Sequence, residues 1–429
     1  MTTTNNNEHK KLNVPNSTDK GNAIRNVPHL RFPEFTEEWE KCKVSDLLAF
    51  YSTNSLSWDK LEYGTDAIQN LHYGLIHVGL PTMIDLSKDK LPNITNGNTP
   101  KNYELCQEGD IAFADASEDT NEVAKAVEFY KLNGKDVICG LHTIHGRDNQ
   151  QKTVVGYKGY AFSSTAFHHQ IRRIAQGTKI YSINSKNFSE CYIGIPSKEE
   201  QKKIATLLRQ IDERIATQNK IIEELKKLKS AIIDYAINSL DTDFVKFGSL
   251  YEMAGEGGTP TTSNASFYDN GKIPFVKIDD LKQKYLTENK DFITELGLQK
   301  SSAWLVPTHS ILFSNGATIG EITITTYPVC TKQGILGIVP KPNIDVEFLY
   351  YFMSSSYFKK AVSRIVTEGT MKTAYLKDIN NILCPIPTKE KQQEIAKMPS
   401  VLNSKIDYEQ SILELFYAQK RYLLHQMFI

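Results

Sequence analysis

The 429-residue sequence contains no long apolar run and no excess of charge of either sign. No stretch approaches the roughly 20 apolar residues of a membrane-spanning helix, and the polar amino terminus lacks the apolar core of a signal peptide. The 50 basic and 50 acidic residues cancel, so nucleic-acid binding would need local basic surfaces. We therefore predict a globular cytoplasmic protein, long enough for two to four domains.

Cysteine is scarce, and its spacing in the sequence matches neither of two common uses of it. The six cysteines stand far apart in the sequence, which predicts neither a disulfide framework nor a zinc motif and agrees with a reducing compartment. Two pairs of histidines, His142 with His145 and His168 with His169, have no acidic third ligand at a metal-binding spacing. We interpret them as ordinary histidines and predict no metal site. The cysteines are Cys42, Cys106, Cys139, Cys191, Cys330 and Cys384.

Catalytic signatures are also absent. The sequence has no Walker phosphate loop, no His-Glu-x-x-His and no Cys-x-x-Cys, and it lacks the Asn-Pro-Pro-aromatic loop that adenine methylases carry at the reacting base. The glycine-rich run at 255–258 is followed by Pro260 rather than by a helix-forming segment, so a structural turn explains it better than a phosphate site. We predict a chain that catalyses no reaction by itself.

The sequence does contain a long internal repeat. The run Ile195–Gln201 recurs as Ile386–Gln392, 191 positions later, and the same displacement continues to the carboxyl terminus, for example from Ile204 to Ile395. A register held over that length indicates a tandem duplication. Each copy consists of a variable globular part followed by a long helix with a heptad pattern.

The globular parts alternate short apolar runs with Gly, Asn and Asp, which predicts mixed α/β (α+β) domains. We expect helices over Trp39–Phe50 and Ala161–Ala175, and strands at residues 109–114, 136–139, 273–278, 310–314 and 334–339. The predicted division is a disordered tail at 1–28, a first globular domain at 29–194, a central helix at 195–240, a second globular domain at 241–385 and a carboxyl-terminal helix at 386–429.

The two long helices carry apolar residues at alternating steps of three and four, which is the seam of a coiled coil. Such a helix needs a partner, and the other copy is available in the same chain. We predict antiparallel pairing with a pseudo-two-fold internal symmetry, and a polar layer where Gln218 meets Glu409. Pro399 should kink the second helix or make it restart near Met398–Ser400. The first seam is Ile204, Leu208, Ile211, Ile215, Gln218, Ile222, Leu225, Lys229 and Ile232, and the second is Ile395, Pro399, Leu402, Ile406, Glu409, Leu413, Phe416, Lys420 and Leu423.

Ordered motifs within this frame resemble a known family. The second globular part carries Gly257-Gly258-Thr259-Pro260, Ile273-Pro274-Phe275-Val276-Lys277, Ile319-Gly320, Thr331-Lys332-Gln333 and Glu368-Gly369-Thr370. The first carries Phe113-Ala114-Asp115-Ala116-Ser117-Glu118-Asp119, Gly140-Leu141-His142-Thr143-Ile144 and Gln176-Gly177-Thr178. After the tail, nearly the whole chain resembles the DNA-specificity subunit of a type I restriction-modification system, with two recognition domains of different types.

The resemblance implies a non-catalytic subunit that binds double-stranded DNA. Each recognition domain would read one half of a bipartite, asymmetric target, while the paired helices set the spacer and dock two methylation subunits. Two translocase-nuclease subunits would complete the complex that cuts. S-adenosylmethionine, ATP and magnesium would belong to those partners, and this chain would hold no cofactor.

Base and phosphate contacts need cationic, amide and hydroxyl side chains, most of them on loops. A solvated charge or a turn-stabilising hydroxyl is the alternative at every one of these positions. Our candidates in the first domain are Lys125, His142, Thr143, Arg172, Arg173, Thr178, Lys179 and Tyr181, and in the second Thr259, Lys277, Ser314, Asn315, Thr318, Lys332, Gln333, Thr370 and Lys372. The candidates for partner binding are Leu207, Ile221, Leu228 and Tyr235.

Two other classes of protein stay open at this point. An assembly scaffold, in which the helices and the globular domains bind only proteins, would suit the zero net charge, and it predicts no DNA binding beyond a nonspecific, salt-sensitive background. A nuclease or methylase in its own right would need a catalytic cluster that the sequence does not contain. A bipartite methylation motif in genomic DNA would separate the specificity subunit from both.

Overall fold

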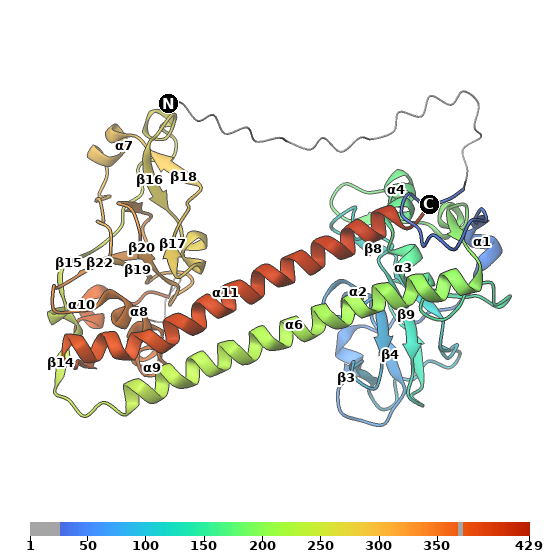
Figure 1. The fold of residues 1–429 in the computed structure, drawn as a ribbon, viewed down its shortest axis with the longest axis horizontal. Coiled ribbons are helices and arrows are strands. Elements are labelled where there is room, and N and C mark those ends of the chain that lie inside the picture. The colour runs from blue at the N-terminus through green and yellow to red at the C-terminus, as the bar shows by residue number, and fades with distance from the viewer. Residues whose placement is uncertain (1–25, 368–371) are drawn as a thin grey trace, which may run out of the picture. The chain divides into compact units, whose positions relative to one another are not determined.

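The computed structural model describes residues 26–367 and 372–429. These residues form two compact units. Unit 1 contains the described residues up to Ala216 together with Glu414–Ile429, and unit 2 is Thr217–Leu413. Two long helices, α6 (Lys198–Asn238) and α11 (Lys389–Gln426), contribute to both units (Figure 1). Most of the predicted disordered tail, residues 1–25, lies outside the described residues.

Unit 1 is built on a five-stranded sheet with the order β2-β11-β7-β9-β5 and a four-stranded sheet with the order β10-β4-β6-β3. Helices α3 and α4 follow the sheets. The bounds are β1 (Glu40–Lys43), α1 (Val44–Leu47), β2 (Ala49–Tyr51), β3 (Leu61–Glu62), β4 (Gln69–Leu71), α2 (Tyr73–His77), β5 (Met83–Asp85), β6 (Asn93–Ile94), β7 (Ile111–Ala114), β8 (Ala116–Ser117), β9 (Ala126–Lys131), β10 (Val137–Cys139), β11 (Thr143–Arg147), α3 (Lys158–Phe162), α4 (Thr165–Ile174), β12 (Tyr181–Ser182), α5 (Ser185–Ser189) and β13 (Tyr192–Ile195).

Unit 2 repeats this plan with a five-stranded sheet in the order β15-β22-β19-β20-β17 and a three-stranded sheet in the order β18-β16-β21. Its helices α8 and α9 correspond to α3 and α4. The bounds are β14 (Phe244–Lys246), β15 (Tyr251–Glu256), β16 (Ile273–Val276), β17 (Tyr285–Leu286), β18 (Asp291–Ile293), α7 (Glu295–Gln299), β19 (Ile311–Ser314), β20 (Ile322–Thr325), β21 (Cys330–Thr331), β22 (Ile335–Pro340), α8 (Val346–Ser354), α9 (Ser356–Ile365), α10 (Leu376–Ile379) and β23 (Leu383–Pro385).

The main sheets of the two units share their pairing pattern as well as their order. The outermost strand, β5 or β17, pairs parallel with its neighbour, whereas the other pairings in both five-stranded sheets are antiparallel. The strand at the centre, β7 or β19, is buried along its whole length. Its aromatic side chain packs edge-to-face on the helices, Phe113 on Phe162 and Phe313 on Phe358. The duplication seen in the sequence is therefore a duplication of the fold.

The two long helices pair, and within unit 2 the pairing is antiparallel. Gln218 of α6 contacts Glu409 of α11, and further along α6 Lys229 donates a hydrogen bond to Asn403. The residue numbers of the contacts rise along α6 as they fall along α11, so the helices run in opposite directions. The predicted polar layer is confirmed. The Gln218 amide nitrogen donates to the Glu409 carbonyl oxygen at 3.0 Å and also to its carboxylate, and both side chains are buried.

Two of our local predictions need correction. The restart that we allowed at Pro399 is wrong, because helix α11 runs through that proline as one helix, although proline removes one backbone hydrogen bond. The kink stays a prediction. The expected helix at Trp39–Phe50 is instead strand β1, a single turn of helix and strand β2, because β1 pairs with β13 at the start of α6. The expected helix at Ala161–Ala175 is present as α3 and α4, and the expected strands are present as β7, β10, β16, β19 and β22.

Candidate nucleic-acid interface

In unit 1 four of the predicted residues, Lys125, His142, Arg172 and Tyr181, lie at the segment between β7 and β9, which spans Asp115–Lys125. The loop closes on itself, because the Ala114 N–H donates to the Lys125 carbonyl at 3.0 Å and the Ala124 N–H donates to the Ala114 carbonyl at 2.9 Å. Ala124 has a positive φ of 59°, a conformation that costs energy in an L-residue and holds only where surrounding contacts fix it. The segment Asp115–Lys125, called the platform below, therefore has a defined conformation.

His142 lies against the first residue of this platform. Its Nδ1 atom is 3.1 Å from the Asp115 carboxylate, and its carbonyl oxygen accepts a hydrogen bond from the Asp115 N–H at 3.1 Å. The ring packs edge-to-face on Tyr73 and remains exposed. Tyr181 joins from the other side, because β12 pairs with β8 and places Tyr181 opposite Ser117. An exposed imidazole beside a carboxylate can donate or accept at a base edge.

The basic residues of unit 1 are partly neutralised by the same loop. Arg172 at the end of α4 donates to Asn121 at 3.0 Å, and Lys125 donates to Glu122 at 2.8 Å. Both cations are thus held near the loop, but only Lys125 has its charge offset, by the carboxylate of Glu122. Arg173, Thr178 and Lys179 are exposed on the end of α4 and the segment after it, and Thr143 is buried with its hydroxyl donating to the Gly140 carbonyl at 2.6 Å.

In unit 2 four of the predicted residues, Thr259, Lys277, Lys332 and Gln333, gather where the glycine-rich run passes the segment after β21. Neither Gly257 nor Gly258 has room for a side chain, because a Cβ at Gly257 would lie 2.2 Å from the Thr331 hydroxyl and one at Gly258 would lie 2.4 Å from the Ala303 backbone nitrogen. The close approach of two backbones requires glycine at both positions. The run is therefore structural, but the turn that we predicted is wrong: residues 255 and 256 end strand β15, and residues 257–260 form no turn.

Backbone hydrogen bonds bring the candidates of unit 2 to this turn. The Gln333 N–H donates to the Thr259 hydroxyl at 3.3 Å, and the Lys332 N–H donates to the carbonyl of Val276, which precedes Lys277. The side chains of Lys332 and Gln333 are exposed. Lys277 is also exposed and forms an ion pair with Asp291 at 2.8 Å. Thr259, Lys277, Lys332 and Gln333 thus form one polar surface group.

Two other candidates of unit 2 are poorly placed for direct contact. Ser314 and Asn315 are buried, and their side chains donate to the carbonyl oxygens of Thr318 and Ala374. A buried side chain that is already bonded internally cannot reach a base edge without refolding its loop, so we assign these two, like Thr143, a structural role. Thr318 is exposed, Lys372 is exposed beside a cavity of about 470 Å³, and Thr370 lies outside the described residues.

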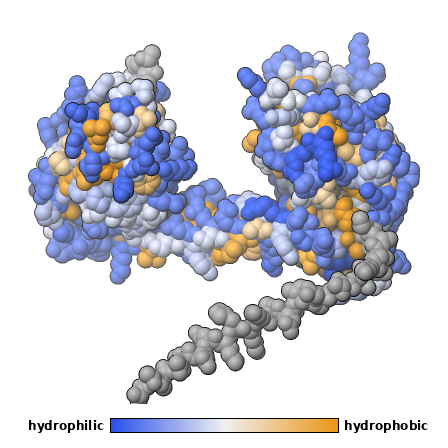
Figure 2. All heavy atoms as spheres, turned by 90° about the horizontal axis from the view of Figure 1, so that it is seen from above, coloured by the Kyte–Doolittle hydropathy of each residue, from blue (hydrophilic) through white to orange (hydrophobic). Residues whose placement is uncertain are grey.

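The candidates for partner binding lie on α6. Leu228 and Tyr235 are 49% and 77% exposed, Ile221 is 40% exposed, and Leu207 is half-buried. Apolar side chains also reach the surface of α11, and orange patches interrupt the polar surface along the helices (Figure 2). On α11 these residues are Met398, Val401, Tyr408, Leu415, Tyr417 and Tyr422.

The structure adds residues that our reasoning from sequence missed. Asp115, Asn121 and Tyr73 lie at the platform of unit 1 through their contacts with His142 and Arg172. Asp115 belongs to a motif that we had recognised, so a signal for it existed. Asn121 and Tyr73 have no such signal, because only the folded loop brings them near the other candidates.

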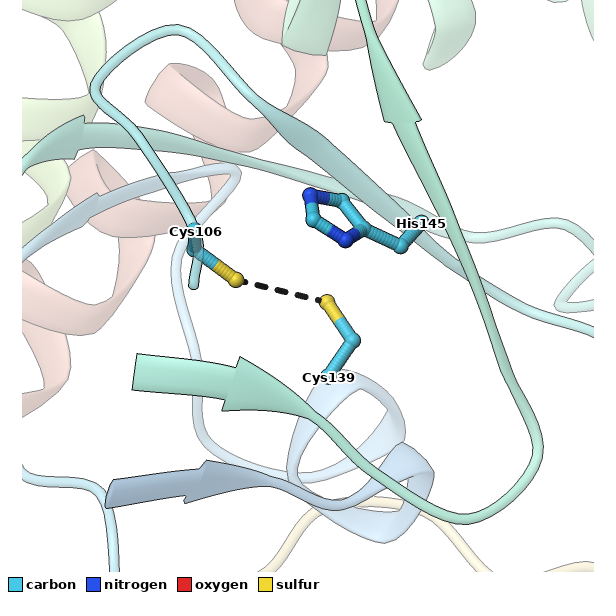
Figure 3. Close-up of side chains that lie close together, drawn as sticks. All are labelled: Cys106, Cys139 and His145. Atoms are coloured by element: carbon cyan, nitrogen blue, oxygen red, sulfur yellow. Dashed lines mark hydrogen bonds between the residues drawn. The ribbon is translucent and has the colours of Figure 1, made fainter. Parts of the chain in front are cut away.

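A different cluster lies in the interior of unit 1. The sulfur atoms of Cys106 and Cys139 are 3.6 Å apart, and His145 lies beside them (Figure 3). The other side of the His145 ring binds Asp110, with Nε2 at 2.7 Å from Oδ2. Burial by itself would raise the pKa of Asp110, but hydrogen bonds from His145 and Arg147 bring that pKa below its ordinary value. The carboxylate is therefore charged and fixed in place.

The fold defines a class of protein: two α/β globular domains, or heads, each followed by a long helix, that arose by duplication. Asp115 and His142 form the surface group of unit 1, and Thr259, Lys277, Lys332 and Gln333 form that of unit 2. The sequence profile of the type I restriction modification DNA specificity domain matches residues 90–227 and 240–415, more than half of the chain. The chain therefore belongs to this family of type I specificity subunits. In the described parts of the chain, no helix is both long enough and apolar enough to span a membrane.

Individual relatives agree with the family assignment. The chain is 25% identical over 347 residues to the type I restriction enzyme MjaVIII specificity subunit of Methanocaldococcus jannaschii, covering 70% of this chain and 81% of that one. It is 23% identical over 401 residues to the EcoBI specificity subunit of Escherichia coli, covering 81% and 83%. Its fold is similar to that of the S subunit crystal structure from M. genitalium, with a TM-score of 0.52 and 17% identity over 94% of this chain and 99% of that one.

Proposed function

We propose that this chain is the non-catalytic DNA-binding subunit of a type I complex and that each unit reads one half of a bipartite, asymmetric target in double-stranded DNA. The single observation that carries the proposal is that two heads with the same sheet order present different surface groups. Two domains with the same sheet order but different exposed side chains suit a target whose two halves differ in sequence.

The chemistry of each surface group supports base reading. In unit 1 the carboxylate of Asp115 beside His142 offers an acceptor for the N4 amino group of cytosine. In unit 2 the exposed Lys332 and Gln333 offer donors to guanine and a paired donor and acceptor to adenine. The flanking cations, Arg173 and Lys179 in unit 1, would bind phosphates and set the position of the head on the duplex.

The helices would set the number of unread base pairs between the two halves and dock two methylation subunits. The polar layer of Gln218 and Glu409 supports the first role, because a buried polar pair fixes the register of a coiled coil. The exposed apolar side chains of α6 and α11 support the second, because apolar surface of this kind marks protein interfaces. Leu207, Ile221, Leu228 and Tyr235 are our candidates on α6.

The complex would gain its chemistry from other chains. Two methylation subunits would supply S-adenosylmethionine chemistry, and two translocase-nuclease subunits would supply ATP- and magnesium-dependent cleavage. We expect the complex to act in the cytoplasm, where the chain would meet genomic DNA. DNA binding by the complex should weaken as salt rises, because phosphate contacts release counterions.

The test is to co-express the chain with its methylation subunit and to map methylated adenines across genomic DNA. We expect one motif with two specified blocks separated by unspecified bases. A methylation subunit expressed without the chain serves as the control and should leave that motif unmodified. An uninterrupted motif, or a bipartite motif that also appears in the control, would contradict the proposal.

A further inference from the structure

The buried cluster of unit 1 plays no part in the proposed function, and its geometry points to a metal. Cys106 lies just before β7, Cys139 ends β10, and His145 is in the middle of β11. Their ligand atoms lie within 4.8 Å of one another, and all three side chains are buried (Figure 3). We propose that Cys106, Cys139 and His145 bind a zinc ion through both sulfur atoms and the Nδ1 atom of the imidazole ring.

The distance between the two sulfur atoms fits zinc. Two thiolates bound to one tetrahedral zinc ion at about 2.3 Å each lie about 3.8 Å apart, and the Cys106 and Cys139 sulfurs are 3.6 Å apart. Both cysteines are free thiols. The ligand atoms of all three side chains lie within 4.8 Å of one another, so the histidine nitrogen must move closer to the sulfurs when the ion binds.

The histidine is prepared as a ligand by its surroundings. Its Nε2 atom faces the charged carboxylate of Asp110, which also accepts hydrogen bonds from Arg147 and from the Gln107 backbone N–H. A proton on Nε2 leaves a lone pair on Nδ1, and metal-binding histidines are held by a carboxylate in this way. Among the described residues Nδ1 of this fully buried ring has no hydrogen-bond partner. A buried polar nitrogen without a partner is costly, and a bound cation would satisfy it.

The backbone of the cluster is also fixed before any metal binds. The Cys106 N–H donates to the Val137 carbonyl at 2.8 Å, and the Asn54 side chain donates to the Cys139 carbonyl at 2.9 Å. His145 pairs with Tyr51 and with Ala112 across the main sheet. Three positions held by separate hydrogen bonds lose little entropy on binding an ion, which favours affinity.

The charges of a zinc complex would balance without exposure to solvent. Two thiolates cancel the double charge of the ion, the imidazole is neutral, and Arg147 cancels Asp110. Zinc binds thiolates, so its binding displaces thiol protons and weakens as pH falls. These three side chains supply three ligands, and a water molecule would supply the fourth.

The site would connect the two sheets of unit 1. Cys139 belongs to the four-stranded sheet and His145 to the five-stranded sheet. The segment between them carries His142, which has a positive φ of 53°. A zinc ion that ties both ends of this segment would stabilise unit 1 and hold the position of His142, whatever unit 1 binds.

The experiment uses the full chain, produced with zinc and purified under reducing conditions, with metal content measured by plasma mass spectrometry. We expect about one zinc ion per chain and its loss in the Cys106→Ser, Cys139→Ser double variant. Cys191→Ser is the matched control, because Cys191 is a free cysteine of unit 1 with the same 5% exposure as Cys106. Zinc below about one tenth of an equivalent in the wild type, or equal zinc in the wild type and the double variant, would overturn the proposal.

Two measurements on the wild-type chain avoid the risk that the variant fails to fold. Cobalt in place of zinc should give an intense thiolate-to-metal charge-transfer band, and a mercurial reagent should release zinc in step with its reaction with two thiols. A cobalt spectrum without that band, or mercurial titration without release of metal, would contradict the site. A folded chain that is purified under reducing conditions and still contains a Cys106–Cys139 disulfide and no metal would also contradict the site.

Discussion

The two units differ far more at their surface groups than at the start of their long helices. Gln201 donates to the carbonyl of Pro196 at 2.9 Å and accepts from the Val154 N–H at 2.8 Å. Gln392, its equivalent in the repeat, donates to Pro387 and accepts from Asp345 at the same distances. The two surface groups share no such contacts. The duplication has therefore preserved the hydrogen bonds at the start of each long helix. It has not preserved the side chains that each globular domain exposes in its surface group.

This difference is what the proposed function requires. Equivalent hydrogen bonds at the start of both long helices would suit two identical methylation subunits. Unequal surface groups would suit unequal halves of a target. Unit 1 adds one further difference, the buried Cys106, Cys139 and His145 cluster, for which unit 2 has no counterpart among its described residues.

The largest expected effect comes from Gln201 and Gln392, whose equivalent hydrogen bonds join each globular domain to the start of its long helix. Gln201→Ala and Gln392→Ala should each destabilise their own unit by about 2–3 kcal/mol, because each removes a buried side chain and leaves backbone groups without a partner. Hydrogen exchange measured by mass spectrometry can follow each unit separately. The exposed neighbour Gln393→Ala is the control and should change little. Unequal losses of stability in the two glutamine variants would contradict the equivalence of these contacts.

Loss of the polar layer between the helices should have an intermediate effect. Gln218→Leu leaves the buried Glu409 without its amide partner and should cost about 1–2 kcal/mol. Adding Glu409→Leu should restore part of that loss, since an apolar pair fits a coiled-coil seam, while the register becomes less specific. Urea denaturation of the single and double variants measures both. A double variant less stable than Gln218→Leu would exclude a polar layer of this kind.

A smaller effect is expected at the surface group of unit 2. Lys332→Ala should weaken binding of the complex to target DNA by about 1 kcal/mol. The loss will be uniform over target variants if Lys332 contacts phosphate, and confined to one base position if it contacts a base edge. Binding titrations on a panel of single-base variants distinguish the two. The exposed Lys246→Ala, in the small β14–β23 sheet, is the control, and an unchanged affinity for Lys332→Ala would remove that residue from the interface.

The smallest effect is a pH dependence that only unit 1 should show. Burial, and then the charge of Arg172, lower the pKa of His168 below its ordinary value. Below about pH 6.5 the unfolded histidine takes up a proton that the folded one does not. Stability should therefore fall as the pH drops through 6.5 and level off below the folded pKa. The equivalent position in unit 2 is Lys359.

His168→Gln provides the matching measurement. The unfolding free energy of unit 1 between pH 7.5 and 5.5 should depend less on pH in this variant than in the wild type, because one proton-uptake step is removed. The same slope in both proteins would show that His168 does not contribute.

Much of the frame could be predicted from the sequence, because it rests on periodicity. The heptad seam, the contact of Gln218 with Glu409 and the strands β7 and β19 all follow from spacing and burial. Local patterns failed where distant pairing decides the structure. The segment Trp39–Phe50 has helix-like spacing, yet β1 is fixed by β13, more than 140 residues away.

The surface groups and the metal cluster depended on the fold itself. Asn315 is a polar loop residue in the sequence, but the folded chain buries it. Cys106 and Cys139 are 33 positions apart and match no ligand spacing, and only the pairing of β10 and β11 with their neighbours brings them to His145. Side-chain partners that come from separate strands leave no local signal in one sequence.

The most direct test of the central claim is an exchange of residues 30–190 for the corresponding recognition domain of another specificity subunit, followed by mapping of methylated adenines in cells that also express the methylation subunit. The account predicts that one block of the motif changes while the other block stays the same. A motif in which both blocks change, or in which neither changes, would contradict it.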